Sequence, residues 1–230
     1  IRFKRNRLAV AGLIILCIFY LLALGAEFFA PYSLNHRHDD YRNAPPRKIR
    51  FFDKEGNFHL RPFVYGMSSE FDMKTFTEKY VTDTSERSPI YFLVRGDKYT
   101  FWNLFETDFH LFGTKAPGTV FLLGTDRQGR DLFSRCIFGA RISLSVGLIG
   151  VFLSIILGAS LGTISGYYAG TVDNVMQRII ELLLVFPRIP LWMALAAAVP
   201  DYWSSLQVFF GISVILSFIS WAGLARQIRA

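Results

Sequence analysis

The sequence predicts an all-α polytopic membrane protein with a small β-rich extracytoplasmic insertion. Hydrophobic residues make up 52% of the 230 residues and the mean hydropathy is +0.32, which is more apolar than an ordinary soluble domain. Apolar runs with few or no charges recur along the chain, as lipid requires because a charge at the bilayer centre is costly. One long polar segment, rich in phenylalanine, separates the first run from the others.

The first apolar run, residues 8–25, predicts a membrane helix inside a segment that covers residues 1–30. A basic cluster precedes the run and favours a cytoplasmic N-terminus by the positive-inside rule. A cleaved signal peptide is the alternative, since a basic start and an apolar stretch that ends in small residues look similar. Further apolar runs downstream argue against cleavage.

The second run, residues 142–172, carries no formal charge and would exceed the hydrocarbon core as one helix, so part of it must tilt or emerge. Tyr167 and Tyr168 are typical of the headgroup level. Small residues recur every four positions and predict a close helix-packing face. These are Gly150, Ser154, Gly158, Gly162, Gly166 and Gly170.

The third run, residues 182–199, is interrupted by two prolines, and we expect its helix to begin near Pro190 or to be kinked there. The fourth run covers residues 208–225. Short polar links are expected at residues 173–181 and 200–207.

Alternation across the bilayer places the basic N-terminus and the pair Arg226 and Arg229 on the cytoplasmic side. The connector at residues 173–181 has no positive excess. Two of the three cytoplasmic segments therefore follow the positive-inside rule.

Residues 31–123 are predicted to form a small β-rich domain outside the membrane. Their length exempts them from the positive-inside count. Two hairpin turns are expected, at Asp53–Gly56 and at Arg95–Asp97, each flanked by short strand-like runs. The expected strands are residues 49–52, 58–60, 90–94 and 99–102.

Residues 124–141 predict an amphipathic helix that lies at the membrane surface before the second span. Thr125 or Asp126 can cap it, and apolar residues then recur on one face. The arginines at 130, 135 and 141 can reach lipid headgroups or carboxylates. A simple interfacial anchor is one explanation of this pattern.

Several chemistries have no basis in the sequence. There is no G-x-x-x-x-G-K-[ST] motif, so we expect no nucleotide binding of the P-loop type. The basic residues are scattered, which argues against nucleic acid. His36 and His38 lie in a polar loop, where histidines are more often solvated than metal-bound. We expect no catalytic site and no metal site in this chain.

Two motifs resemble one family. Residues 124–144 read GTDRQGRDLFSRCIFGARISL and resemble the G-T-D-x-x-G-R-D-x-x-S-R-x-x-x-G-x-R-x-S-L pattern of dipeptide and oligopeptide ABC transporter permeases, specifically the second of the two paired permease subunits. Residues 166–173, GYYAGTVD, continued by Phe186-Pro187, resemble that family's link between the second and third spans. The matching residues, with a structural or gating role implied, are Gly124, Thr125, Asp126, Gly129, Arg130, Asp131, Ser134, Arg135, Gly139, Arg141 and Ser143.

The resemblance implies the transmembrane domain of a type I ABC importer in the bacterial inner membrane. Residues 142–230 would hold the second to fourth of six spans, ending before a cytoplasmic coupling loop, and residues 31–141 would be periplasmic. The implied partners are a homologous second permease, two cytoplasmic ATPases that bind ATP and Mg²⁺, and a solute-binding protein. The implied mechanism is alternating access.

The long external segment departs from many members of that family, which leaves the solute open among peptides, glutathione, nickel complexes and oligosaccharides. A membrane-anchored receptor with an external ligand-binding domain is the alternative from another class. An ion channel has no support, because no filter-like sequence occurs.

Overall fold

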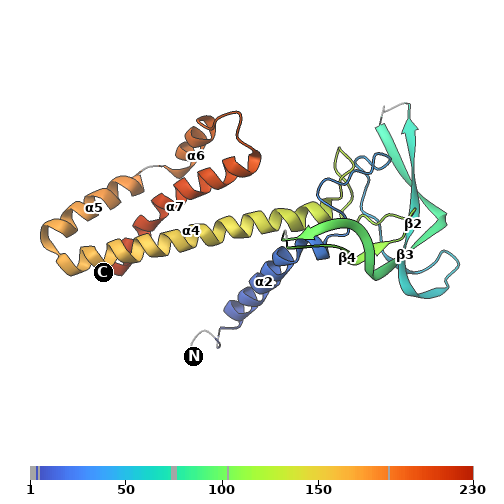
Figure 1. Ribbon diagram of the computed structural model, residues 1–230, viewed down its shortest axis with the longest axis horizontal. Helices are drawn as coiled ribbons and strands as arrows, with labels where there is room; N and C mark the ends of the chain where they lie inside the picture. Colours follow the sequence, from blue (N-terminus) through green and yellow to red (C-terminus); the bar gives the residue numbers. More distant parts are fainter. Residues whose placement is uncertain (1–3, 5, 74–76, 103, 186, 230) are drawn as a thin grey trace. The chain divides into compact units, whose positions relative to one another are not determined.

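The computed structural model describes residues 4 and 6–229, apart from 74–76, 103 and 186. The chain divides into two compact units, residues 1–142 and residues 143–230. Figure 1 traces the helices and strands of each unit. We describe the two units separately.

The first unit begins with α2 (Arg7–Leu24), which covers the first predicted run. Its N-terminus is capped by Asn6, whose side-chain oxygen accepts hydrogen bonds from the amides of Leu8 and Ala9 at 3.1 and 3.3 Å. A short helix, α3 (Ala26–Phe29), follows directly. Ala23 is the only buried residue among the described residues of α2. The large apolar side chains of this helix are therefore exposed, and an apolar medium outside the chain has to cover them.

A four-stranded antiparallel sheet forms the insertion, in the order β1-β2-β3-β4. Its strands are β1 (Arg50–Phe52), β2 (Phe58–Asp72), β3 (Thr77–Phe101) and β4 (Phe105–Thr114). The strands follow one another as a meander, in which each pairs with the next along the chain. Val64, Ile90 and Val120 form its buried core.

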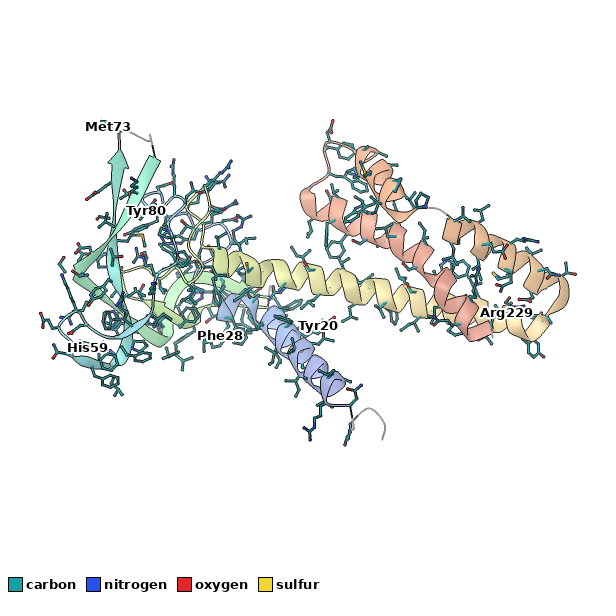
Figure 2. All side chains as sticks on the ribbon, turned by 180° about the vertical axis from the view of Figure 1, so that it is seen from behind. Tyr20, Phe28, His59, Met73, Tyr80 and Arg229 are labelled. Atoms are coloured by element: carbon teal, nitrogen blue, oxygen red, sulfur yellow. The ribbon has the colours of Figure 1, made fainter. Side chains whose placement is uncertain are left out.

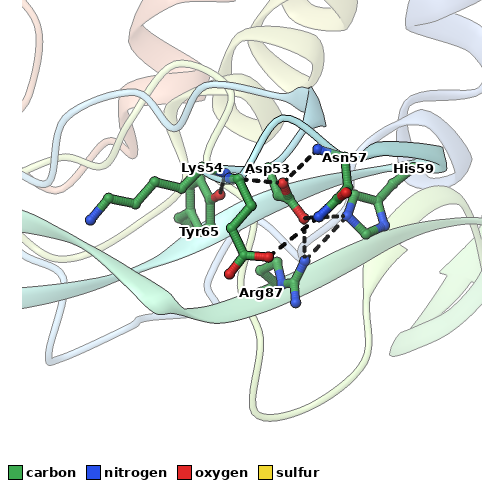
Figure 3. Close-up of polar contacts among 7 residues, drawn as sticks. Asp53, Lys54, Asn57, His59, Tyr65 and Arg87 are labelled. Atoms are coloured by element: carbon green, nitrogen blue, oxygen red, sulfur yellow. Dashed lines mark hydrogen bonds and ion pairs between the residues drawn. The ribbon is translucent and has the colours of Figure 1, made fainter.

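The turn expected at Asp53–Gly56 connects β1 and β2 in the structure. Asp53 Oδ1 accepts hydrogen bonds from the amides of Glu55 and Asn57, and Asp53 Oδ2 contacts His59 Nε2 at 2.9 Å and Arg87 Nη1 at 3.0 Å (Figure 3). The hydrogen bond with His59, followed by those from Asn57 and Glu55, holds the pKa of Asp53 well below its usual range. One carboxylate thus closes the turn and ties it to β3.

The prediction of a turn at Arg95–Asp97 is wrong. β3 continues through these residues, and its pairing with β4 only shifts register between Arg95 and Tyr99. The chain reverses after Phe101, which pairs with Phe105. Tertiary contacts outweigh the local turn signal, because the Asp97 carboxylate accepts a hydrogen bond from the Ser33 amide at 3.0 Å and lies 2.7 Å from His36 Nδ1.

The prediction of a separate amphipathic helix before the second span is also wrong. The helix α4 (Leu132–Tyr168) runs without a break from the expected interfacial segment into the second apolar run. The caps expected at Thr125 or Asp126 are wrong as well, since Asp131 precedes the first helical residue and accepts from the Ser134 amide at 2.7 Å.

The second unit contains the rest of α4, α5 (Gly170–Val185), α6 (Arg188–Ala197) and α7 (Ser205–Arg229). The polar link expected at residues 173–181 is helical and belongs to α5, so that expectation is wrong. α4 stops where Ala169 and Gly170 take left-handed φ values of 48° and 56°. The core of this unit joins Ile180 of α5 to Trp221, Ala222 and Ala225 of α7.

Three helices of the described chain are long and apolar enough to cross a membrane: α2, α4 and α7. The pair α5 and α6, bent by 77°, passes the same test together and would make a fourth span. α6 begins at Arg188, two residues before Pro190, near which the helix was expected to begin or to be kinked. The chain is therefore a polytopic membrane protein, with apolar helices in both units.

Candidate functional site

The first motif folds into a tight loop that packs on the chain leading out of the first helix. Thr125 forms an isolated antiparallel bridge with Asp131. Its hydroxyl accepts a hydrogen bond from the Ala44 amide at 2.8 Å and donates one to the Tyr41 carbonyl. The motif thus fixes the path of residues far away in sequence.

Two motif glycines are required by this packing. Gly124 and Gly129 have φ values of 80° and 72°, in the left-handed region that favours glycine. A Cβ at Gly124 would clash with the Ala44 carbonyl oxygen, and one at Gly129 with the His38 carbonyl oxygen. Both close approaches are to backbone, so neither site can accept a side chain without moving the loop.

Asp126 is the centre of the motif's charges. Its Oδ1 accepts hydrogen bonds from the amides of Gln128 and Arg130 at 2.8 and 3.0 Å. Its Oδ2 accepts from Arg130 Nε at 2.9 Å and also from Arg135 Nη1. Burial opposes ionisation, but the hydrogen bonds and the charge of Arg130 outweigh it and lower the pKa of Asp126 to about 2. Arg130 and Arg135 are thus paired with a carboxylate, which is one of the two kinds of partner expected for them, the other being a lipid headgroup.

Asp131 and Ser134 form the buried start of α4. Asp131 Oδ2 accepts from both the amide and the hydroxyl of Ser134 at 2.7 Å, and the Ser134 hydroxyl oxygen accepts from the Tyr32 amide at 3.3 Å. Burial raises the pKa of Asp131. Burial also raises the pKa of Tyr32 to about 12, and the Tyr32 hydroxyl oxygen accepts from the Val120 amide at 2.9 Å.

Arg141 ties α4 to the end of α2. Its Nη1 donates to Glu27 Oε1 at 2.6 Å, and its Nε donates to the Ala23 carbonyl at 2.8 Å. The guanidinium lies 4.6 Å from the ring centre of Trp102, whose indole Nε1 donates to the Leu24 carbonyl at 2.9 Å. Arg141 therefore holds together a helix end, the turn region after β3 and α4 itself.

The remaining residues of the first motif, Gly139 and Ser143, contribute less to its packing. A Cβ at Gly139 would meet nothing within 4 Å. Ser143 lies on α4 where the second unit begins. The first motif is thus assembled mainly by its residues from Gly124 to Arg135 and by Arg141.

The second motif closes one end of the second unit. Asp173 accepts a hydrogen bond from the Ser165 hydroxyl at 2.6 Å and pairs with Arg229. Ser165 belongs to α4, Asp173 to α5 and Arg229, labelled in Figure 2, to α7. The three side chains bind three helices to one another. Phe186 of the motif lies outside the described residues.

Three of the six small residues face α7. A Cβ at Gly158 would lie 2.9 Å from Leu224 Cβ, and one at Gly162 would lie 2.7 Å from the Ala225 carbonyl oxygen. Gly166 lies slightly farther, 3.4 Å from the Arg229 carbonyl oxygen. Gly150 and Ser154 lie on the same helix, whereas Gly170 opens α5 with nothing within 4 Å of its Cβ position.

Sequence reasoning missed several partners of these motifs: Glu27, Trp102, Ser165 and Asp131 as a cap. Glu27 carried a signal, because a carboxylate directly after an apolar run needs a cation to pair with. Trp102 carried none. No group of three or more potential metal ligands occurs in the part of the chain that the structure describes.

Replacing Asp126 with asparagine should lower the melting temperature of the purified protein by about 5 °C at pH 7, because two arginines lose their carboxylate. Since the folded pKa is depressed, the stability from Asp126 is complete above the unfolded value of about 3.9 and is lost as the pH falls toward about 2. Thermal unfolding at pH 7, 5 and 3 checks this. Asp39→Asn, at an exposed ion pair, is the control and should change little.

The comparisons with known proteins find dipeptide and oligopeptide transport permeases. A family model described as the N-terminal TM domain of oligopeptide transport permease C matches residues 1–46. The chain is 28% identical to the dipeptide transport system permease protein DppC of Lactococcus lactis, over 99% of this chain and 55% of that protein. It is 25% identical to the protein of the same name in Bacillus subtilis, over 99% of this chain and 47% of that protein.

A third relative is more similar over a shorter stretch. The oligopeptide transport system permease protein OppC of Haemophilus influenzae is 41% identical, over 46% of this chain and 32% of its own length. The chain spans about half the length of the relatives that it matches from end to end. The resemblance to dipeptide and oligopeptide permeases that the two motifs indicated is confirmed.

Proposed function

We propose that this chain is a permease subunit of an ATP-driven ABC importer for peptides or similar small solutes. One observation carries the proposal: the alignment with a dipeptide permease runs over 99% of the chain, so it includes the insertion as well as the apolar helices. The exposed apolar side chains of α2, α4 and α7 are consistent with it, because lipid would cover them.

The proposed arrangement follows from charge and alternation. The N-terminus is cytoplasmic, the insertion at residues 31–141 is periplasmic, and the protein lies in the bacterial inner membrane. α2, α4, the bent pair and α7 are four of the six spans that the resemblance implies. The partners are a homologous permease, two ATPases that hold ATP and Mg²⁺, and a solute-binding protein.

Transport in this proposal is by alternating access, in which bundles of helices rock as bodies. The contacts of Asp173 with Ser165 and Arg229, together with the glycine face of α4, support a body made of α4, α5 and α7. The charged motif around Asp126 supports a rigid entry to α4. In this proposal the chain provides the path for the solute, and ATP hydrolysis belongs to the partner ATPases.

The test is peptide uptake. A strain that lacks this chain should lose ATP-dependent uptake of a labelled dipeptide, and the full-length gene should restore it. Uptake should also be lost when the partner ATPase carries an inactive nucleotide site, which separates transport from ligand sensing. Undiminished uptake in the strain without the chain contradicts the proposal, and so does uptake that persists with the inactive ATPase.

A further inference from the structure

Arg47 is a buried cation without a buried anion. It is only 7% exposed, and its Nη1 donates to the Thr119 carbonyl at 2.8 Å. Its Nε and Nη2 are buried without a hydrogen-bond partner among the described residues. The rings of Tyr41 and Phe121 lie 4.9 and 5.2 Å from the guanidinium carbon, which favours a cation but supplies no acceptor.

A buried charge of this kind is costly unless something compensates it. The described ion pairs of the insertion use other arginines, such as Arg87 with Asp53. The charge of Arg47 is therefore not compensated by a described carboxylate, and the low dielectric around it carries its field into neighbouring cavities.

Two cavities adjoin Arg47. The first, of about 190 Å³, is lined by three cations, Arg47 and Lys48 in the loop before β1 and Arg50 at the start of β1, and none of its described lining residues is acidic. Lys48 and Arg50 are exposed, so their donors can turn toward a ligand. This cavity has the charge of a carboxylate site.

The second cavity, of about 320 Å³, shares Arg47 and Gly66 with the first. Its wall includes one carboxylate, the exposed Glu86, and two further cations, Arg87 and Lys115, so its charge is also mainly positive. A Cβ at Gly66 would lie 3.0 Å from Glu86 Cβ, so glycine keeps the strands close where the two cavities meet.

We propose that the first cavity, here called the basic groove, binds short peptides, with the C-terminal carboxylate at Arg47, Lys48 and Arg50. The inference rests on the proposed function, because it assigns to the insertion the same solute class that the permease passes. The groove would hold a peptide outside the membrane.

The experiment uses the full-length chain in its complex, without the solute-binding protein, and trialanine as the probe. Calorimetric titration should detect trialanine and should show affinity at least tenfold lower for its C-terminal amide. The double variant Lys48→Ala/Arg50→Ala should lose affinity to the same extent, and because both side chains are exposed it should fold. Arg61→Ala, a cation on β2 that lines neither cavity, should bind as the unaltered protein does.

Equal affinity for the acid and the amide overturns the inference, as does unaltered binding by the double variant. If the double variant instead weakens only the association with the solute-binding protein, the basic groove is a protein-docking surface and the inference is wrong. Uptake by the same complex, with the solute-binding protein added back, separates the two proposals. Transport without trialanine binding rejects the groove alone, whereas binding without transport rejects the permease function alone.

Discussion

Gly162→Leu is expected to abolish transport or assembly of the protein. The Cβ position at Gly162 lies 2.7 Å from the Ala225 carbonyl oxygen and 3.0 Å from the Ala225 Cα, so the side chain would meet backbone rather than a flexible side chain. α4 and α7 would have to move apart, at a cost of about 3 kcal/mol or more, since overpacking a close contact costs about 1–3 kcal/mol for small additions. Small residues at such contacts let helices approach closely.

The matched control is Gly147→Leu on the same helix. Nothing lies within 4 Å of the Cβ position at Gly147, so the same side chain meets open space there. Complex yield in detergent and dipeptide uptake should fall for Gly162→Leu and stay near normal for Gly147→Leu. Normal uptake with stable protein in the Gly162 variant would refute the assignment of this glycine face to α7.

The substitution Arg141→Ala should release the insertion from α4 and from the end of α2, because Arg141 contacts both Trp102 and Glu27. The Arg141 side chain is 23% exposed and that of Glu27 is 11% exposed, so the substitution leaves a mostly buried carboxylate without its cation. Breaking a buried pair from one side costs about 3–5 kcal/mol, and the partial exposure of Arg141 favours the lower value. The contact with Trp102 is lost at the same time.

Limited proteolysis of the purified complex measures this effect. We expect faster cleavage within residues 50–114 and a lower melting temperature. Arg42→Ala, whose ion pair with Asp39 has side chains 57% and 75% exposed, should leave both unchanged because exposed pairs contribute about 0–1 kcal/mol. Similar cleavage of the two variants would mean that Arg141 has no special role.

The hairpin signals show how far local sequence reaches. Asp53 and Gly56 form the expected turn because the Asp53 side chain bonds to amides two and four residues ahead. Arg95, Gly96 and Asp97 carry an equally good turn signal, but Asp97 bonds to Ser33 and His36 instead. No short stretch of sequence around residue 97 contains Ser33 or His36.

The helix boundaries follow the same rule. Charged residues at 173–181 suggested a polar link, yet Met176, Ile180 and Leu183 recur at helical spacing and pack with α7. That apolar spacing was a usable signal. Asp131 as the cap of α4 was less visible, because Thr125 and Asp126 are as good caps locally and only the bridge between Thr125 and Asp131 removes them.

The sequence by itself determined the class of protein, its apolar helices and the family that its motifs resemble, because hydropathy and ordered motifs are properties of the chain alone. Tertiary structure decided what the charged motif residues bind. Asp97 lies 64 residues from Ser33, Arg141 lies 114 residues from Glu27, and Asp173 lies 56 residues from Arg229 in sequence. A buried charge is costly unless a counter-charge lies beside it, and only folding brings residues so far apart in sequence together.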